Sequence, residues 1–170
     1  MFDRRDRLIH DRTELVNQTR AFLAELGLIM PKEIQNFESL FKELTSEYWD
    51  EFNSKIQSVL TENFSEYTTL CKEIDSIDKQ IETEAKGSDD CKRLKKVSGF
   101  GPLISVALYA AIGNGLLFKN EPHLSSYLGL VPGEYSSGGK QRLLGITKRG
   151  SQHLRTLLVL AANAFMTGLS

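Results

Sequence analysis

The sequence predicts a mainly α fold, in which a long helical, coiled-coil-like arm is followed by a compact helical domain. Apolar residues recur at helical spacing through the first half, whereas glycine and proline divide the second half into short segments. The charge also changes sign, from net −9 over residues 31–90 to net +8 over residues 91–170. We therefore divide the chain into an arm, residues 1–90, and a C-terminal domain, residues 91–170.

The size and composition of the chain exclude several classes of protein. Its 170 residues, 41% of them hydrophobic, suffice for one compact domain and an extension but not for a large multidomain enzyme. No run approaches the ~18 apolar residues of a membrane span, and residues 1–10 alternate charges where a signal peptide would be apolar. Cys71 and Cys91 fit no metal or disulfide spacing. We expect a cytoplasmic protein without a membrane partner.

Helical periodicity predicts two long helical stretches in the arm. Apolar residues recur from Leu8 to Leu26, and Gly27 is placed to end that helix. Pro31 then opens a second pattern that continues to about residue 85 without another glycine or proline. A single helix of that length would extend roughly 80 Å at about 1.5 Å per residue, so we expect a turn at the polar stretch 61–65.

The end of the arm carries the apolar seam of a coiled coil. Its apolar residues alternate steps of three and four, and charged residues flank them. Such a seam needs a partner helix, so we interpret the arm as a scaffold and expect a homo-oligomer formed through it. The acids of the arm are spread as a solvated face and indicate neither a metal site nor a catalytic cluster. The seam consists of Tyr67, Leu70, Ile74, Ile77 and Ile81.

The first motif of the C-terminal domain is a helix-hairpin-helix pattern over residues 94–108, LKKVSGFGPLISVAL. Gly99 and Gly101 would permit unusual backbone angles and let the turn's N–H groups approach a phosphate. The helix that follows adds partial positive charge at its N-terminus, and Lys95 and Lys96 are close in sequence. The pattern suits binding of a DNA backbone without base reading. The alternative is an ordinary helical turn that contains two glycines.

A polar, Ser/Gly-rich loop with several cations follows within residues 133–150. Attack of a hydroxyl on a phosphodiester requires positive charge near the phosphoryl oxygens, and this loop combines two hydroxyls with four cations. Neither His123 nor His153 pairs evidently with a serine, so the general base is not identified. The alternative is a plain flexible turn. The hydroxyls belong to Ser136 and Ser137, and the cations to Lys140, Arg142, Lys148 and Arg149.

The last predicted helix covers residues 151–167. Ser151 is placed to cap it, and its apolar residues lie nearly all round, which predicts burial in a core or against another subunit. Its N-terminus follows Lys148 and Arg149 and forms a second natural anion site. Arg155, one turn into the helix, could reach the same anion.

Three stretches carry a resemblance to a known family. They read VSGFGPLISVALYAAIG, YLGLVPGEYSSGGKQRLLGITKRG and HLRTLLVLAA, in uninterrupted order over roughly the last 80 residues. They resemble the C-terminal transposase domain of the DEDD-type insertion-sequence transposases, also described as bridge-RNA-guided recombinases. The amphipathic segments before them resemble the coiled-coil arm that joins this domain to the family's N-terminal RuvC-like nuclease domain.

The resemblance implies a covalent nucleophile and its partners. The family's serine before glycine falls on Ser137, and Ser136 is the weaker candidate. The four acidic metal ligands belong to the RuvC-like domain, which we expect this chain to lack, so we expect no cofactor here and Mg²⁺ only together with that domain. The implied partners are DNA and a guide (bridge) RNA, in the nucleoid-containing cytoplasm of a bacterium or archaeon.

Three functions are therefore consistent with the sequence. The first is the DNA-binding and strand-transfer domain of a transposase, inactive alone, with Ser137 as nucleophile and the loop cations positioning phosphates. The second is a non-catalytic helix-hairpin-helix module that binds DNA through the turn at residues 95–101. The third is a coiled-coil interaction protein that oligomerises through residues 33–85 and has no preference for nucleic acid.

Overall fold

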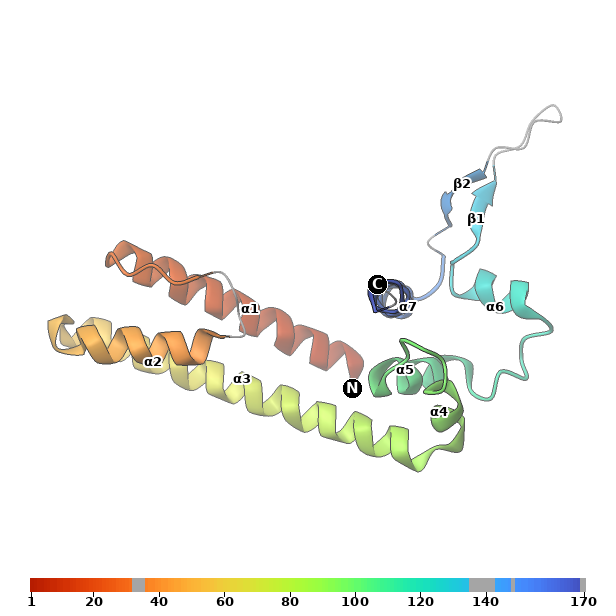
Figure 1. Ribbon diagram of the computed structural model, residues 1–170, viewed down its shortest axis with the longest axis horizontal. Helices are drawn as coiled ribbons and strands as arrows, with labels where there is room; N and C mark the ends of the chain where they lie inside the picture. Colours follow the sequence, from red (N-terminus) through yellow and green to blue (C-terminus); the bar gives the residue numbers. More distant parts are fainter. Residues whose placement is uncertain (32–35, 135–142, 148, 169–170) are drawn as a thin grey trace. The chain divides into compact units, whose positions relative to one another are not determined.

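The computed structural model describes residues 1–31, 36–134, 143–147 and 149–168 (Figure 1). The chain divides into two compact units, Met1–Lys79 and Gln80–Ser170. The described residues form seven α-helices, one 3-10 turn and a single two-stranded sheet, so the predicted mainly α class is confirmed.

The first unit is built on two long antiparallel helices, α1 (Phe2–Glu25) and α3 (Ser54–Gly87), which lie side by side (Figure 1). The start of α1 is paired with the later part of α3, where Arg5 Nε donates to Asp78 Oδ1 at 2.5 Å. A partly exposed ion pair adds at most about 1 kcal/mol to the free energy of unfolding. These contacts therefore add little stability, and their main effect is to set the register of α1 against α3. Two further contacts are Arg4 Nη2 to Glu73 Oε2 at 2.9 Å and Asn63 Nδ2 to Thr19 Oγ1 at 3.2 Å.

Helix α2 (Phe37–Tyr48) closes the core of the first unit. Phe37 is buried against Tyr67 of α3, with ring centroids 4.7 Å apart, and the Phe41 ring stacks on Phe64 at 4.9 Å. Aromatic pairs of this kind add about 0.5–1.5 kcal/mol to the free energy of burial. The buried members of this core are Leu15, Val16, Leu23, Met30, Phe37, Phe41, Leu60 and Tyr67.

The break between the helices of the arm lies earlier than the sequence predicts. A 3-10 turn at Trp49–Glu51 ends α2, and Asn53 Oδ1 accepts the backbone N–H groups of Lys55 and Ile56 at 3.1 and 3.0 Å. Helix α3 then continues through residues 61–65, so the predicted turn there is wrong. The polar side chains of that stretch bond within the helix and to α1, and a cap at the start of α3 decides the boundary.

The predicted coiled-coil seam faces a core inside this chain. Tyr67, Ile74, Ile77 and Ile81 are buried, and Leu70 is half-buried. Tyr67 shares its core with residues of α1, so the seam has a helical partner within the same polypeptide. These apolar positions are therefore already covered before any second copy binds.

Burial gives Tyr67 an unusual titration. Burial, with a smaller contribution from the Cys71 side chain, raises the pKa of the Tyr67 phenol to about 12, from an ordinary value of 10. Because the folded state holds this proton more tightly, its contribution to stability is complete below pH 10 and is lost as the pH rises through 12. We expect Tyr67→Phe to flatten the fall of the free energy of unfolding between pH 10 and 12, measured by denaturant titration at each pH. An unchanged pH profile would contradict this assignment.

The second unit contains the remaining helices and the sheet. Helix α5 packs against α4 and α7, and it buries Ser105, Val106, Ala107 and Leu108. The Cys91 thiol of α4 donates to the Ser105 carbonyl at 3.8 Å. The elements are α4 (Asp89–Leu94), α5 (Pro102–Ile112), α6 (Glu121–Tyr127), β1 (Pro132–Glu134), β2 (Leu143–Ile146) and α7 (Gln152–Thr167).

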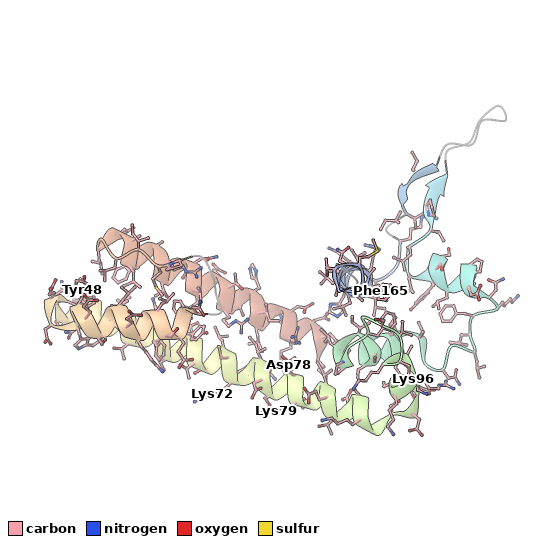
Figure 2. The ribbon with its side chains drawn as sticks, viewed as in Figure 1. Tyr48, Lys72, Asp78, Lys79, Lys96 and Phe165 are labelled. Carbon is pink, nitrogen blue, oxygen red and sulfur yellow. The ribbon has the colours of Figure 1, made fainter. Side chains whose placement is uncertain are left out.

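Helix α7 is less enclosed than its apolar sequence predicts. Only Leu154 and Ala161 are buried, on the side that faces α5 and the turn before it. Large apolar side chains stay exposed in the single chain: Val159, Leu160 and Met166 lie on other sides of α7, and Phe165 (Figure 2) lies one turn beyond Ala161, toward the end of the helix. One helix covers one side of α7, so apolar residues on its other sides stay exposed. Among the described residues, no helix is both long and apolar enough to span a membrane.

Candidate nucleic-acid interface

The stretch predicted as a helix-hairpin-helix forms helix α4, a turn and helix α5 at the start of the second unit. Ser88 Oγ accepts the Cys91 N–H at 3.3 Å and caps α4. The turn that follows is closed by backbone bonds, including Phe100 N–H to Val97 O at 3.0 Å. Pro102 then occupies the first turn of α5, where its missing N–H costs nothing. Because no side chain caps α5, the first N–H groups of this helix are available to an acceptor from outside the helix.

The two glycines of the turn have different physical roles. Gly99 has φ +85°, and a Cβ placed there would lie 2.6 Å from the Ala161 carbonyl oxygen of α7. Gly101 has φ −82°, which any residue adopts, and a Cβ there would meet nothing within 4 Å. Gly99 is thus required for backbone conformation and packing. Only Gly101 leaves open space into which a phosphate could approach.

Alanine substitutions at the two glycines should therefore separate folding from binding. Gly99→Ala is expected to destabilise the second unit by about 2–3 kcal/mol, because it combines left-handed strain with a backbone clash. Gly101→Ala is expected to change the free energy of unfolding by less than about 0.5 kcal/mol. Thermal unfolding followed by circular dichroism measures both values. Equal stability losses in the two variants would contradict this division of roles.

The cations around this turn fall into two groups. Lys92 and Arg93 pair with the acids of their own helix turn, Asp89 at 2.7 Å and Asp90 at 2.6 Å. The hydrogen bond from Lys92 lowers the pKa of Asp89. Lys95 and Lys96 (Figure 2) are exposed, and within the described residues neither forms an ion pair. The second pair of cations therefore keeps its charge available to a polyanion.

The polar loop is held by a hairpin that the sequence analysis did not predict. Strands β1 and β2 are antiparallel, with Pro132 opposite Ile146 and Glu134 opposite Leu143. Thr147 N–H donates to Val131 O at 2.9 Å and extends the pairing toward α7. Five predicted site residues lie outside the described residues, so their contacts are not described. They are Ser137, Lys140, Arg142 and Lys148, together with the weaker nucleophile candidate Ser136.

Two glycines bring the ends of the hairpin together. Gly129 and Gly150 both have positive φ, at +69° and +90°. A Cβ on Gly129 would collide with the backbone of Arg149, and one on Gly150 would collide with the carbonyl of Tyr127. The chain before β1 therefore lies backbone to backbone against the chain after β2. This contact fixes both ends of the hairpin at the start of α7.

Two predicted phosphate ligands are brought together beside this contact. Ser151 Oγ accepts the Leu154 N–H at 3.3 Å and caps α7 as predicted. Arg155 Nη1 donates to the Arg149 carbonyl at 3.5 Å, which places its guanidinium at the N-terminal end of the helix. Arg149 is exposed and Arg155 is half-buried. The positive end of the helix dipole, the Arg155 guanidinium and the backbone of Arg149 thus lie at the base of the hairpin.

The structure adds features that the sequence reasoning missed. The strands are too short for an alternating pattern, and the glycine pair at the hairpin base is recognisable only once both segments are in contact. His123 packs its ring against Phe118, with centroids 5.6 Å apart. The described residues contain no group of three or more His, Cys, Asp or Glu side chains that could hold a metal ion.

Comparison with known families identifies the same region. Residues 91–168 match the sequence model of the Transposase IS116/IS110/IS902 family. This range contains the α4–α5 turn, the hairpin and α7.

Curated relatives resemble nearly the whole chain. It is 37% identical to the transposase for insertion sequence element IS1111A of Coxiella burnetii over 95% of this chain and 44% of that relative. It is 33% identical to the transposase for insertion sequence element IS1328 of Yersinia enterocolitica, over 97% of this chain and 48% of that relative. It is also 34% identical to a probable family 20 transposase of Pseudomonas aeruginosa, over 94% of this chain and 48% of that relative. The chain spans about half the length of these relatives. Residues 91–168 are thus similar to the transposase domain of the IS116/IS110/IS902 family.

Proposed function

We propose that this chain supplies the DNA-binding and strand-transfer part of an insertion-sequence transposase, with Ser137 as the covalent nucleophile. The match of residues 91–168 to a transposase family carries the proposal. The hairpin supports it, because β1 and β2 pair on either side of the segment that contains Ser137, and the chain after β2 leads into α7. The DEDD-type assignment, with a separate RuvC-like domain that binds Mg²⁺, is part of this proposal.

In the proposed reaction the Ser137 hydroxyl attacks a DNA phosphodiester in line. A bond forms between Oγ and phosphorus, the bond from phosphorus to the leaving sugar oxygen breaks, and the serine proton passes to that oxygen through a base outside the described residues. Positive charge stabilises the oxyanions of the transition state. Arg149 and Arg155 are placed at the base of the hairpin for such a role. Lys140, Arg142 and Lys148 are proposed to act with them.

The covalent step is tested with a nicked suicide substrate that traps the protein on DNA. The RuvC-like domain of a relative is supplied in trans. We expect a serine-linked adduct that Ser137→Ala abolishes and Ser136→Ala retains. Peptide mapping locates the adduct, and an adduct that survives Ser137→Ala would assign the nucleophile to another residue.

Binding of DNA is tested through its salt dependence. The logarithm of the affinity should fall by about 0.9 per logarithmic unit of salt for each phosphate neutralised on duplex DNA. Lys95→Gln and Lys96→Gln should each reduce the magnitude of that slope by about 0.9, which corresponds to the loss of one phosphate contact. Lys55→Gln, an exposed lysine of the acidic arm, is the control and should leave the slope unchanged. Affinity that does not respond to salt would contradict the proposal.

A second candidate function is a non-catalytic DNA-binding module, which is favoured by the available N-terminus of α5 beside Lys95 and Lys96. This function keeps the salt dependence and predicts no covalent adduct. A guide RNA is a further proposed partner of the same basic surface. Competition between duplex DNA and structured RNA for the chain would test it, and RNA that fails to compete would exclude a shared surface.

We also propose that the chain forms a homo-oligomer through its arm. Because the seam of α3 is already buried in the single chain, the contact must use other faces of the arm. Sedimentation equilibrium of the full chain tests this. A monomer at all concentrations would exclude it.

A further inference from the structure

The second unit carries two neighbouring leucines that point into solvent. Leu116 and Leu117 lie in the segment between α5 and α6 (Figure 1) and are 84% and 83% exposed. Val97 is 49% exposed and lines the same pocket as Gly115, the residue before Leu116. Single exposed apolar side chains are ordinary on a protein surface, whereas a group of them in one place marks a contact surface.

The segment that carries these leucines is a closed turn, residues 112–118, which we call the leucine turn. Gly115 N–H donates to Ile112 O at 3.1 Å, and Phe118 N–H donates to Gly115 O at 3.1 Å. Leu116 N–H donates to Asn114 Oδ1 at 3.2 Å. The Phe118 ring then packs against two rings of α6. Because the turn is already ordered, it loses little conformational entropy when the leucines bind a partner.

An apolar pocket of about 200 Å³ lies directly beside the leucine turn. One wall comes from α4 and the residues after it, and the other from the end of α5 and the turn itself. Leu94, Val97 and Ile112 supply its large apolar side chains. A cavity of about 150 Å³ with such a lining accommodates a group as large as benzene, so this pocket has room for a leucine side chain.

The rim of the pocket carries one charge of each sign. Arg93 Nη2 donates to Asp90 Oδ1 at 2.6 Å, and both residues line the pocket. Their side chains are 71% and 31% exposed, so both charges remain accessible to an arriving surface. Nucleic acid carries only negative charge and would meet Asp90 unfavourably. A surface with both signs side by side is instead complementary to its own copy across a two-fold axis.

We propose that this surface of the second unit binds the same surface of a second copy of the chain about a two-fold axis. The leucines of each copy enter the pocket of the other, and Arg93 of each copy pairs with Asp90 of the other. One short stretch supplies both the leucines and a wall of the pocket, so a single contact fills both pockets at once. The contact has an apolar centre and a charged rim, as stable protein interfaces do. It is separate from the association through the arm and does not depend on strand transfer.

The leucines are tested by sedimentation equilibrium of the full chain. We expect a monomer–dimer equilibrium whose dissociation constant rises at least about tenfold when Leu116→Asp and Leu117→Asp are combined. Leu144→Asp, which changes an exposed leucine of β2 in the same unit, is the control and should leave the constant unchanged. Circular dichroism should show that all variants fold, because the three side chains are exposed. A chain that is monomeric at all concentrations, or a dimer that the leucine changes do not weaken, would overturn the proposal.

The rim charges separate a contact between copies from a contact within one chain. Asp90→Arg leaves two positive charges at the rim and Arg93→Asp leaves two negative ones. Each variant alone should dimerise about tenfold more weakly, since the two-fold axis repeats each unfavourable pair. An equimolar mixture of the two variants should recover association, because the positive rim of one copy meets the negative rim of the other.

A second ion pair of α4 provides the matched control for the rim charges. Asp89 and Lys92 have the same spacing and lie 2.7 Å apart, but they do not line the pocket. Asp89→Arg and Lys92→Asp should therefore show neither the loss of association nor its recovery on mixing. A mixture of the rim variants that associates no more strongly than either variant alone would overturn the proposal.

Discussion

Replacing Gly129 by alanine is expected to destabilise the second unit by about 3 kcal/mol or more. The new Cβ would collide with the Arg149 backbone, and φ of +69° is strained for any residue with a side chain. Both segments are main chain, so no side-chain rotation relieves the clash. Thermal unfolding gives the loss of stability, and hydrogen exchange should show lost protection over residues 125–155 while α1 keeps its protection.

Gly145→Ala is the matched control for this variant. Gly145 belongs to β2, and a Cβ there would meet nothing within 4 Å. We expect a change in the free energy of unfolding of less than about 1 kcal/mol. If Gly129→Ala were as stable as Gly145→Ala, the backbone contact at the hairpin base would not exist in solution.

The second large effect is expected in the core of the arm. Leu60 is fully buried within the cluster that joins α1, α2 and α3. Leu60→Ala should lower the free energy of unfolding by about 2–5 kcal/mol, because it removes buried methyl groups and leaves a cavity. Trp49, the single tryptophan of the chain, packs against this cluster and reports unfolding by fluorescence in a denaturant titration.

The neighbouring residue provides the control for this core substitution. Val59 precedes Leu60 on α3 and is 40% exposed. Val59→Ala should cost less than about 1 kcal/mol in the same titration, since Val59 is partly exposed and its loss leaves no enclosed cavity. Similar losses for both variants would mean that Leu60 does not face the core.

Local patterns predicted much of the secondary structure. The serine cap of α7 and the start of α5 at Pro102 are where the sequence indicates. The buried face of α3 also agrees with its apolar spacing, because a helical period of 3.6 residues assigns those positions to one side. The sequence predicts the break at residues 61–65, whereas the structure has it at residues 49–53. The prediction is wrong because polar residues such as Thr61 can satisfy their hydrogen bonds inside a long helix without ending it.

The site was predicted less completely than the helices. The sequence predicts Arg149 and Arg155 as phosphate ligands, and the structure adds that one donates to the carbonyl of the other at the start of α7. Gly99 is predicted to lie beside a phosphate, but in the structure it packs against the backbone of Ala161. A glycine pattern shows that space or an unusual φ is needed, but only the fold shows what occupies that space.

The sequence alone indicates that the chain is mainly helical, that its second half is basic, and that this half resembles a transposase domain. These properties follow from periodicity, composition and local motifs, which are written within short stretches of chain. The contacts of the fold established that the seam of α3 is covered within the chain and that Gly129 and Gly150 join the hairpin ends. Those facts depend on which distant residues come into contact, and no local pattern encodes that.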